Sequence, residues 1–365
     1  MGLEEDVTSR DGLLASLRDV TEKQFMLVRN LVGPVEAALG QAGLEVIDRG
    51  FRQFGEWRAE NLRIAPSAIA GNQNARALLQ NWDSGDLVLG TLDASTEIVG
   101  GPLKASVTMP SMLGSEQFTG LGKADLLRRY WAETMSGMAA GFSEGCTIRS
   151  DAPDIFGPWT ITVDFLASHA KGRVRSDIGI DTEILSDPER ALPLIRRSSR
   201  NAGALYMFVA REVIRAYDAA GEQLVREGVR GFGRERGLAL REKHLREGRE
   251  LNMKTLMLDW DGPLVSTWVF KDEGYLSEGT WHQDCVYCPY ADVWSQFGNE
   301  GLDLGYLYDV ELHTTLYQTY HPQTLVRWES LKTRGDHVCR FRFSIPDLVG
   351  PEDPQFSMKK RAAGD

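Results

Sequence analysis

The sequence contains no run of about 18 apolar residues, so it predicts no membrane-spanning helix. Basic residues are also few, because 41 lysines and arginines stand against 52 aspartates and glutamates and leave a formal net charge of −11. Without a basic excess to neutralise phosphates, we expect neither nucleic acid nor an anionic membrane surface as a partner. The hydrophobic content of 42% and the charged content of 25% are typical of a soluble globular protein.

Cysteine is scarce, with four residues in a chain of 365. So few cysteines do not form a disulfide framework in a chain of this length. The N-terminus, Met-Gly-Leu-Glu-Glu-Asp, is acidic and lacks the hydrophobic core of a secretion signal. We therefore expect a cytoplasmic protein with reduced thiols. The sequence also lacks a glycine-rich phosphate loop, a nucleophile-elbow serine and a His-Glu-x-x-His motif.

An internal repeat organises the chain. A shift of 178 positions aligns Gly50, Arg52, Phe54, Gly55, Arg58, Leu62 and Arg63 with Gly228, Arg230, Phe232, Gly233, Arg236, Leu240 and Arg241. Ordinary residue frequencies would give roughly one identity in such a window. The same shift places Trp82-Asp83 on Trp260-Asp261 and Tyr130 on Tyr308. We infer a tandem duplication, with chance similarity between two helical stretches as the alternative.

The expected elements follow a similar order in both halves. In the first half we expect helices over about 25–39, 44–63 and 123–140 and strands over 86–89, 105–109 and 159–165. After a connector over 166–200, we expect helices over about 206–216, 222–249, 290–297 and 302–320 and strands over 263–270, 279–287 and 340–343. The predicted fold is α+β, a helical pair plus an antiparallel sheet in each of two similar halves. We place a degenerate copy at 1–190, a copy carrying the site at 191–350 and a flexible tail at 351–365.

The stretch from Trp281 to Tyr290 places Cys285 and Cys288 where a strand runs into a helix. Pro289 suits the first helical position, because its φ is fixed and it has no N–H to leave unbonded. Cys288 would then lie at the helix N-terminus, where free N–H groups favour a thiolate and lower its pKa. A thiolate can act as a nucleophile or as a metal ligand.

Asp309 and His313 stand four residues apart on an expected helix and therefore share a face. Such a pair can hold a metal, or can work as a histidine base oriented by a carboxylate. The corresponding positions of the N-terminal half carry apolar residues: Met109, Trp131, Met135 and Ile161, opposite Cys288, Asp309, His313 and Cys339. This contrast indicates one active and one degenerate half.

Two assignments of the site follow from these residues. In the first, Cys288 is the nucleophile, His313 is the base and Asp309 orients it. In the second, Cys288, Asp309, His313 and Cys339 hold Zn²⁺ or Fe²⁺, with Glu329 as a further ligand. In either case we expect the substrate to contact Trp281, Tyr290, Tyr308 and His321. The structural alternative makes the cysteines small buried hydrophobes and the Asp309/His313 pair a structural hydrogen bond, with His244 and His337 in solvent.

Three segments resemble the L-2-amino-thiazoline-4-carboxylic acid hydrolase family over roughly 200–345. They are 210–237, Cys288-Pro289-Tyr290-Ala291 and the stretch from Gly335 to Phe343. The family's Cys-Pro and Cys-x-Phe-x-Phe motifs map onto Cys288-Pro289 and onto Cys339, Phe341 and Phe343. The resemblance implies a cytoplasmic enzyme that opens a small cyclic C–N bond. In this family a cysteine commonly occupies the position of Asp309 and an acidic residue lies near that of His313, so the family's substrate does not carry over directly to this chain.

The segment from Glu329 to Cys339 also resembles the 4-vinyl-reductase-like small-ligand domains, which bind zinc through cysteines and a glutamate. We expect a hydrolase-like enzyme that opens a ring or cleaves a C–N or C–C bond in a small cyclic or aromatic molecule, with a lyase or metal-dependent reaction as variants. The alternative is a non-catalytic protein that binds or senses a small ligand and holds a structural metal. The two halves would form a pseudo-dimer, or pair with a second chain as a homodimer.

Overall fold

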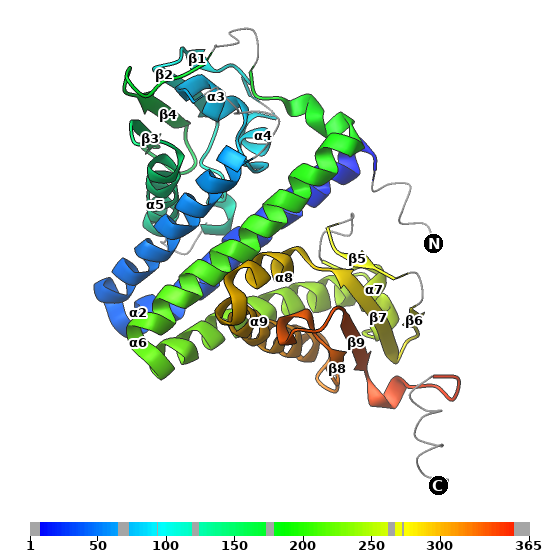
Figure 1. The fold of residues 1–365 in the computed structure, drawn as a ribbon. Coiled ribbons are helices and arrows are strands. Elements are labelled where there is room, and N and C mark those ends of the chain that lie inside the picture. The colour runs from blue at the N-terminus through cyan, green and yellow to red at the C-terminus, as the bar shows by residue number, and fades with distance from the viewer. Residues whose placement is uncertain are drawn as a thin grey trace. The chain divides into compact units, whose positions relative to one another are not determined.

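The computed structural model describes residues 8–64, 73–92, 94–118, 124–172, 179–261, 267–271 and 274–353. The chain forms two compact units, an N-terminal unit (Met1–Glu222) and a C-terminal unit (Gln223–Asp365). Each combines helices with an antiparallel sheet, as predicted for the α+β class (Figure 1). The division falls inside helix α6 (Pro188–Arg246). The first residues of this helix occupy part of the connector expected over 166–200. No helix in the described ranges is long and apolar enough to cross a bilayer.

The N-terminal unit begins with α2 (Arg10–Ile64), in which a kink at Gly40 separates the two helices expected from the sequence. The next elements are α3 (Ala75–Gln80), α4 (Asp86–Thr91), β1 (Val99–Gly100), β2 (Lys104–Met109), η1 (Ser115–Phe118), α5 (Ala124–Phe142), β3 (Cys146–Asp151), β4 (Trp159–Phe165) and η2 (Thr182–Ser186). The strand predicted over 86–89 is wrong, because this segment is α4. A short apolar run does not distinguish a strand from one turn of buried helix.

The sheet of the N-terminal unit has the order β1-β2-β4-β3, and every neighbouring pair is antiparallel. Along β4 the residues alternate between buried and partly exposed, which directs Trp159 and Ile161 into the core. The ring of Trp131, on α5, lies 4.8 Å from that of Trp159. Met109 and Met135 are buried as well. The positions that correspond to the predicted site are therefore filled by apolar core in this unit.

The C-terminal unit contains the last part of α6, then α7 (Met253–Leu258), β5 (Val269–Phe270), β6 (Tyr275–Leu276), β7 (Thr280–Tyr287), α8 (Pro289–Trp294), η3 (Ser295–Phe297), α9 (Gly298–Tyr320), β8 (Trp328–Ser330), η4 (Lys332–Arg334), β9 (Cys339–Ser344) and η5 (Pro346–Leu348). Its sheet has the order β5-β7-β9-β8, and β6 also pairs with β7. Of the strand predicted over 263–270, residues 263–266 lie outside the described residues and 269–270 form β5. Of the predicted tail, 354–365 also lie outside them.

Each unit repeats features of the other at the 178-residue spacing. The strand order β2-β4-β3 of one sheet matches β7-β9-β8 of the other, with a long helix, α5 or α9, before the last two strands. Arg58 forms a buried ion pair with Asp83 (2.6 Å), and Arg236 forms one with Asp261 (2.7 Å). The pair of Arg52 with Glu133 likewise corresponds to that of Arg230 with Glu311. These equivalences support a tandem duplication, and common ancestry of the two units stays a hypothesis.

The kinks of α2 and α6 also stand 178 residues apart. Gly40 has φ 56° and ψ −138°, and Asp218 has φ 48° and ψ −128°. Asp218 is the one non-glycine residue with positive φ in the described part of the chain, and its side chain is exposed. A Cβ atom disfavours this backbone conformation, whereas glycine adopts it readily.

We expect Asp218→Gly to raise the free energy of unfolding by about 1 kcal/mol, because it removes backbone strain and no buried contact. The matched variant Gly40→Asp should lower it by a similar amount. A Cβ at Gly40 meets no heavy atom within 4 Å, so its cost is conformational. Urea unfolding followed by circular dichroism measures both changes. A destabilised Asp218→Gly variant would show that the aspartate side chain supports the kink.

Candidate functional site

Cys288 lies where β7 passes into α8, as the sequence predicted. It is the N-cap residue of α8, Pro289 follows at the first helical position, and the Ala291 N–H donates a hydrogen bond to Cys288 Sγ (3.5 Å). All four cysteines are free thiols, and Cys288 alone is partly exposed while the other three are buried. Cys288 is therefore the least buried of the four cysteine residues.

The two central strands of the C-terminal sheet place one face toward α9. In their register Cys285 lies opposite Cys339, and Trp281 lies opposite Phe343. Side chains alternate along a strand, so Cys339, Phe341 and Phe343 share the face on which the ring of His313 lies 5.7 Å from that of Phe341. Arg340 and Arg342 point to the other face and pair with Asp284. The Cys-x-Phe-x-Phe motif therefore places three side chains on the sheet face near His313.

Asp309, on α9, is a partly buried residue whose carboxyl group lies near the thiols of Cys288 and Cys339. Thr333 Oγ1, in η4, donates a hydrogen bond to Asp309 Oδ2 (2.7 Å). Burial raises the pKa of Asp309 to about 7, although the Thr333 hydrogen bond acts in the opposite direction. The carboxylate lies within electrostatic range of Cys288 and Cys339, since it raises the pKa of both thiols. At neutral pH this group is divided between its acid and its base form.

His313 is held by the main chain of its own helix. Its Nδ1 lies 2.8 Å from the main-chain oxygen of Asp309, so Nδ1 carries the proton and Nε2 is the acceptor. Burial lowers the pKa of His313 to about 4, so the ring is neutral near pH 7. Asp309 and His313 share a face as predicted. However, the group that orients the ring is the carbonyl of Asp309, while its carboxylate binds Thr333.

The expected low pKa of Cys288 is wrong for the free protein. Burial raises the pKa of this thiol to about 11, and the nearby Asp309 adds to the increase. The Ala291 N–H lowers the pKa, but it does not outweigh burial. Burial likewise raises the pKa of Cys339 to about 12. Cys288 is therefore a protonated thiol that needs a base before it can react.

Aromatic rings surround these groups. The ring of Tyr290 contacts the rings of Trp268 (5.4 Å) and Tyr308 (5.8 Å). Trp268 also packs against the buried cluster of Cys285, Leu331 and Cys339. Trp281 stacks on Phe341 at 5.4 Å. Three of the four residues predicted to contact substrate, Trp281, Tyr290 and Tyr308, thus lie among the rings that pack around Cys288 and His313.

Two predicted residues lie elsewhere. His321 is the C-cap of α9, about 18 Å beyond Asp309 along the helix axis at 1.5 Å per residue. Glu329 is exposed and pairs with Arg342 (3.1 Å), whose side chain belongs to the outer face of the sheet. Neither joins the cluster formed by Cys288, Asp309 and His313.

Within the described ranges the side chains do not assemble a metal site. Among the described residues no three His, Cys, Asp or Glu side chains converge in a way that could hold a metal ion. The proposed zinc or iron ligands Cys288, Asp309, His313, Cys339 and Glu329 therefore do not fit such a site in this arrangement.

Some functional neighbours carry no signal in the sequence. Thr333 contacts Asp309 from 24 residues away, and Trp268 precedes the cysteine pair in a segment with no motif. His244 was expected in solvent, but it is fully buried between Tyr320 and Asp259, at 2.8 Å from each. His337 is exposed, as expected.

Comparison with known proteins places residues 197–343 in correspondence with the L-2-amino-thiazoline-4-carboxylic acid hydrolase family. No curated protein and no solved structure matches the chain. The matched region contains Cys288, Asp309, His313 and Cys339, and ends at Phe343. The family match confirms the resemblance seen in the motifs and supports a hydrolase-type activity on a small molecule.

Proposed function

We propose that this chain, similar over residues 197–343 to a family of hydrolases, is a cysteine-dependent hydrolase that opens a C–N bond in a small ring. Cys288 is the nucleophile and Asp309 is the proton acceptor. The assignment rests on the position of Asp309, whose carboxyl group lies within electrostatic range of Cys288, the one partly exposed cysteine, and whose pKa burial raises to about 7. A general base works best when its pKa lies near the working pH. His313, with a pKa of about 4, is a weaker base.

The reaction follows from these protonation states. Asp309 takes the Cys288 proton as the sulfur attacks the electrophilic ring carbon, so an S–C bond forms. The ring C–N bond then breaks, and the leaving nitrogen receives the proton from Asp309. A water molecule, deprotonated by Asp309, next attacks the same carbon and releases the sulfur. That proton returns to Cys288, which restores the starting thiol and carboxylate.

His313 positions the substrate in this scheme. Its Nδ1–H is occupied by the Asp309 carbonyl, so Nε2 can accept a hydrogen bond from a ring N–H or from water. The rings of Phe341 and Trp328 lie 5.7 and 6.2 Å from the imidazole. Both are partly exposed and suit a planar ligand. The N-terminal unit, with apolar core at the same positions, would play a structural part.

Thr333→Val tests the role of Asp309. Removing the hydrogen bond to the carboxylate should raise the pKa of Asp309, because Thr333 now lowers it. A hydrogen bond to a charged group is worth roughly 1.5–3 kcal/mol, so the acidic limb of the kcat/KM profile should move about one pH unit upward. Above that limb the activity should recover.

The profile can be measured first with the compound that names the matched family, and then with other small cyclic amidines and lactams. Thr319→Val, on α9, is the control and should leave the limb near pH 7. An unchanged limb in Thr333→Val, or one that moves to lower pH, would remove Asp309 from the mechanism.

A further inference from the structure

The sulfur of Cys288 accepts hydrogen bonds from two segments of the C-terminal unit. The main-chain N–H of Ala291 donates to it at 3.5 Å, and the main-chain N–H of Tyr290 donates to it as well. The third donor is the indole N–H of Trp268, the residue just before β5. Three N–H groups therefore converge on one sulfur atom.

Packing holds Trp268 beside this sulfur. The side chains of Trp268 and Cys288 pack against the same buried cluster, which contains Cys285 and Cys339. The ring of Trp268 also meets that of Tyr290 edge to face, with 5.4 Å between the centroids and 60° between the planes. Tyr290 belongs to the first turn of α8, so the contact ties the indole to the segment that supplies the other two donors.

The N-terminal unit also has a sulfur at the matching position. Met109 stands opposite Cys288 in the repeat, and Gly90 stands 178 residues before Trp268. Gly90 and Met109 are in contact, since a Cβ atom added to Gly90 would lie 2.3 Å from Met109 Sδ. In each unit the residue at the position of Trp268 thus lies against the sulfur at the position of Cys288.

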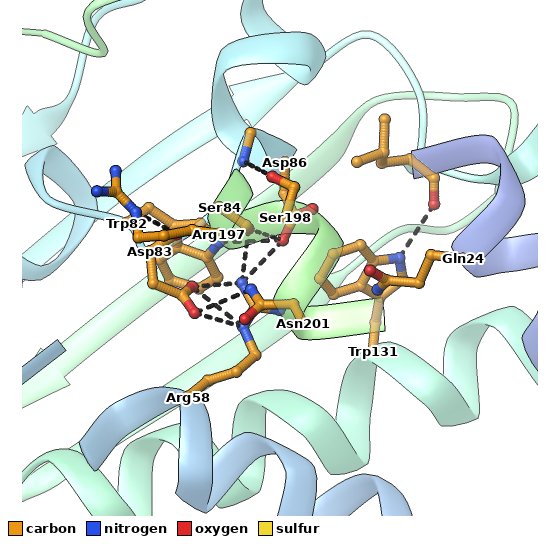
Figure 2. Close-up of polar contacts among 12 residues, drawn as sticks. Gln24, Arg58, Trp82, Asp83, Ser84, Asp86, Trp131, Arg197, Ser198 and Asn201 are labelled. Carbon is orange, nitrogen blue, oxygen red and sulfur yellow. Dashed lines mark hydrogen bonds and ion pairs between the residues drawn. The ribbon is translucent and has the colours of Figure 1, made fainter. Parts of the chain in front are cut away.

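This contact in the N-terminal unit belongs to a helix that is anchored at its first residue (Figure 2). Asp86, at the start of α4, accepts hydrogen bonds from Arg58 Nη2 (2.9 Å) and from Trp82 Nε1 (3.3 Å). Gly90, on the same helix, leaves room for the buried side chain of Met109. A thioether has no proton to lose. The change from glycine to tryptophan therefore accompanies the change from a thioether to a thiol that can ionise.

N–H donors stabilise a thiolate more than a thiol, because a hydrogen bond to a charged acceptor is roughly twice as strong as one to a neutral acceptor. We infer that the indole N–H of Trp268 stabilises the negative charge that develops on Cys288 Sγ during the reaction, together with the two main-chain N–H groups. Trp268 is a positioning residue, since it acts on the nucleophile and not on the substrate. This role rests on the proposed function.

The charge on the sulfur arises at two points of the proposed reaction. It arises first when Asp309 takes the thiol proton and the sulfur attacks the ring carbon. It arises again when the S–C bond breaks and the sulfur leaves with the electron pair of that bond. At both points the donors oppose burial, which raises the pKa of the thiol to about 11.

Alkylation of Cys288 by iodoacetamide in the full chain, followed by mass spectrometry, tests the role of Trp268. Trp268→Phe keeps an aromatic ring and removes the N–H, so the pKa of the thiol should rise by about one unit. The thiolate fraction near pH 8 then falls about tenfold, but the more basic sulfur is the better nucleophile, so the rate should fall about threefold. Trp260→Phe, the same change at a tryptophan that stacks on Tyr317, should leave the rate unchanged.

A purely structural role predicts the opposite result, because a smaller ring would uncover the sulfur and accelerate alkylation. An unchanged or faster rate in Trp268→Phe would therefore overturn the inference. If this variant does not fold, benzothienylalanine at position 268 carries the test. That residue replaces the indole N–H by sulfur and keeps the shape of the ring, and the same slower rate is expected.

Turnover separates this inference from the proposed function. In Trp268→Phe the plateau of kcat/KM should fall about tenfold while the limb that reports Asp309 stays near pH 7. If Cys288→Ser keeps full turnover while Trp268→Phe slows alkylation, the donors act on the thiol without the cysteine mechanism. If Cys288→Ser loses turnover while Trp268→Phe is alkylated at the wild-type rate, the mechanism stands without Trp268.

Discussion

Replacing Cys288 with serine should lower kcat/KM by about 10³-fold or more. A hydroxyl is a far weaker nucleophile than a thiol, and no other partly exposed cysteine can substitute for it. The fold should persist, because a serine oxygen at the N-cap accepts the Ala291 N–H at least as well as sulfur does. Steady-state kinetics and thermal unfolding of the same preparation separate loss of chemistry from loss of structure.

Cys146→Ala is the matched control, since Cys146 is a buried thiol in β3 of the N-terminal unit. It should leave kcat/KM unchanged. Metal content measured on the same samples addresses the zinc or iron alternative. Bound metal that disappears in Cys288→Ser would favour ligation by this sulfur, and full turnover by the variant would exclude a nucleophilic role.

Asp309→Asn should abolish turnover and yet stabilise the protein at alkaline pH. Folding raises the pKa of this carboxyl from 3.8 to about 7. Between those values the unfolded chain is ionised while the folded protein keeps the proton, so stability falls as the pH rises. Above about pH 7 the full cost is present, at most about 4 kcal/mol at 1.36 kcal/mol per pKa unit. The amide of the Asp309→Asn variant is neutral at every pH, so its burial carries no such loss of stability.

We therefore expect Asp309→Asn to have a free energy of unfolding about 2–4 kcal/mol higher than the wild type near pH 8 and nearly equal near pH 4. Urea unfolding at the two pH values measures the difference. Asp303→Asn, an exposed change on the same helix, should show no such dependence. If the difference in unfolding free energy between Asp309→Asn and the wild type were the same at both pH values, folding would not raise the pKa of Asp309.

Local rules were enough to place Cys288 at the junction of β7 and α8. Pro289 marked the start of a helix, and the alternation of Cys339, Phe341 and Phe343 marked one face of a strand. The chemical state of Cys288 could not be predicted in the same way. The helix N-terminus lowers a thiol pKa, but burial by distant segments opposes it and prevails. Sequence spacing alone carries no measure of that burial.

Contacts between segments distant in the sequence also explain the other differences between the predicted and the observed structure. Asp309 and His313 share a helix face by simple periodicity, but the hydrogen-bond partner of the carboxylate, Thr333, comes from another element. The run from Asp86 to Leu89 reads equally well as a strand or a helical turn, and its ion pair with Arg58, 28 residues earlier, carries no signal in the sequence. His244 stands in a mostly charged run, 241–247, which did not indicate a buried position.

Helix α6 has a practical consequence for dissecting the molecule. Residues 202–210 of this helix are buried in the N-terminal unit, whereas Arg236 belongs to the other unit. A fragment cut at the predicted boundary of 190/191 would carry that apolar stretch away from the core it completes, and should aggregate. The bend at Asp218 is the better place to sever the chain, because the backbone already leaves the helical conformation there.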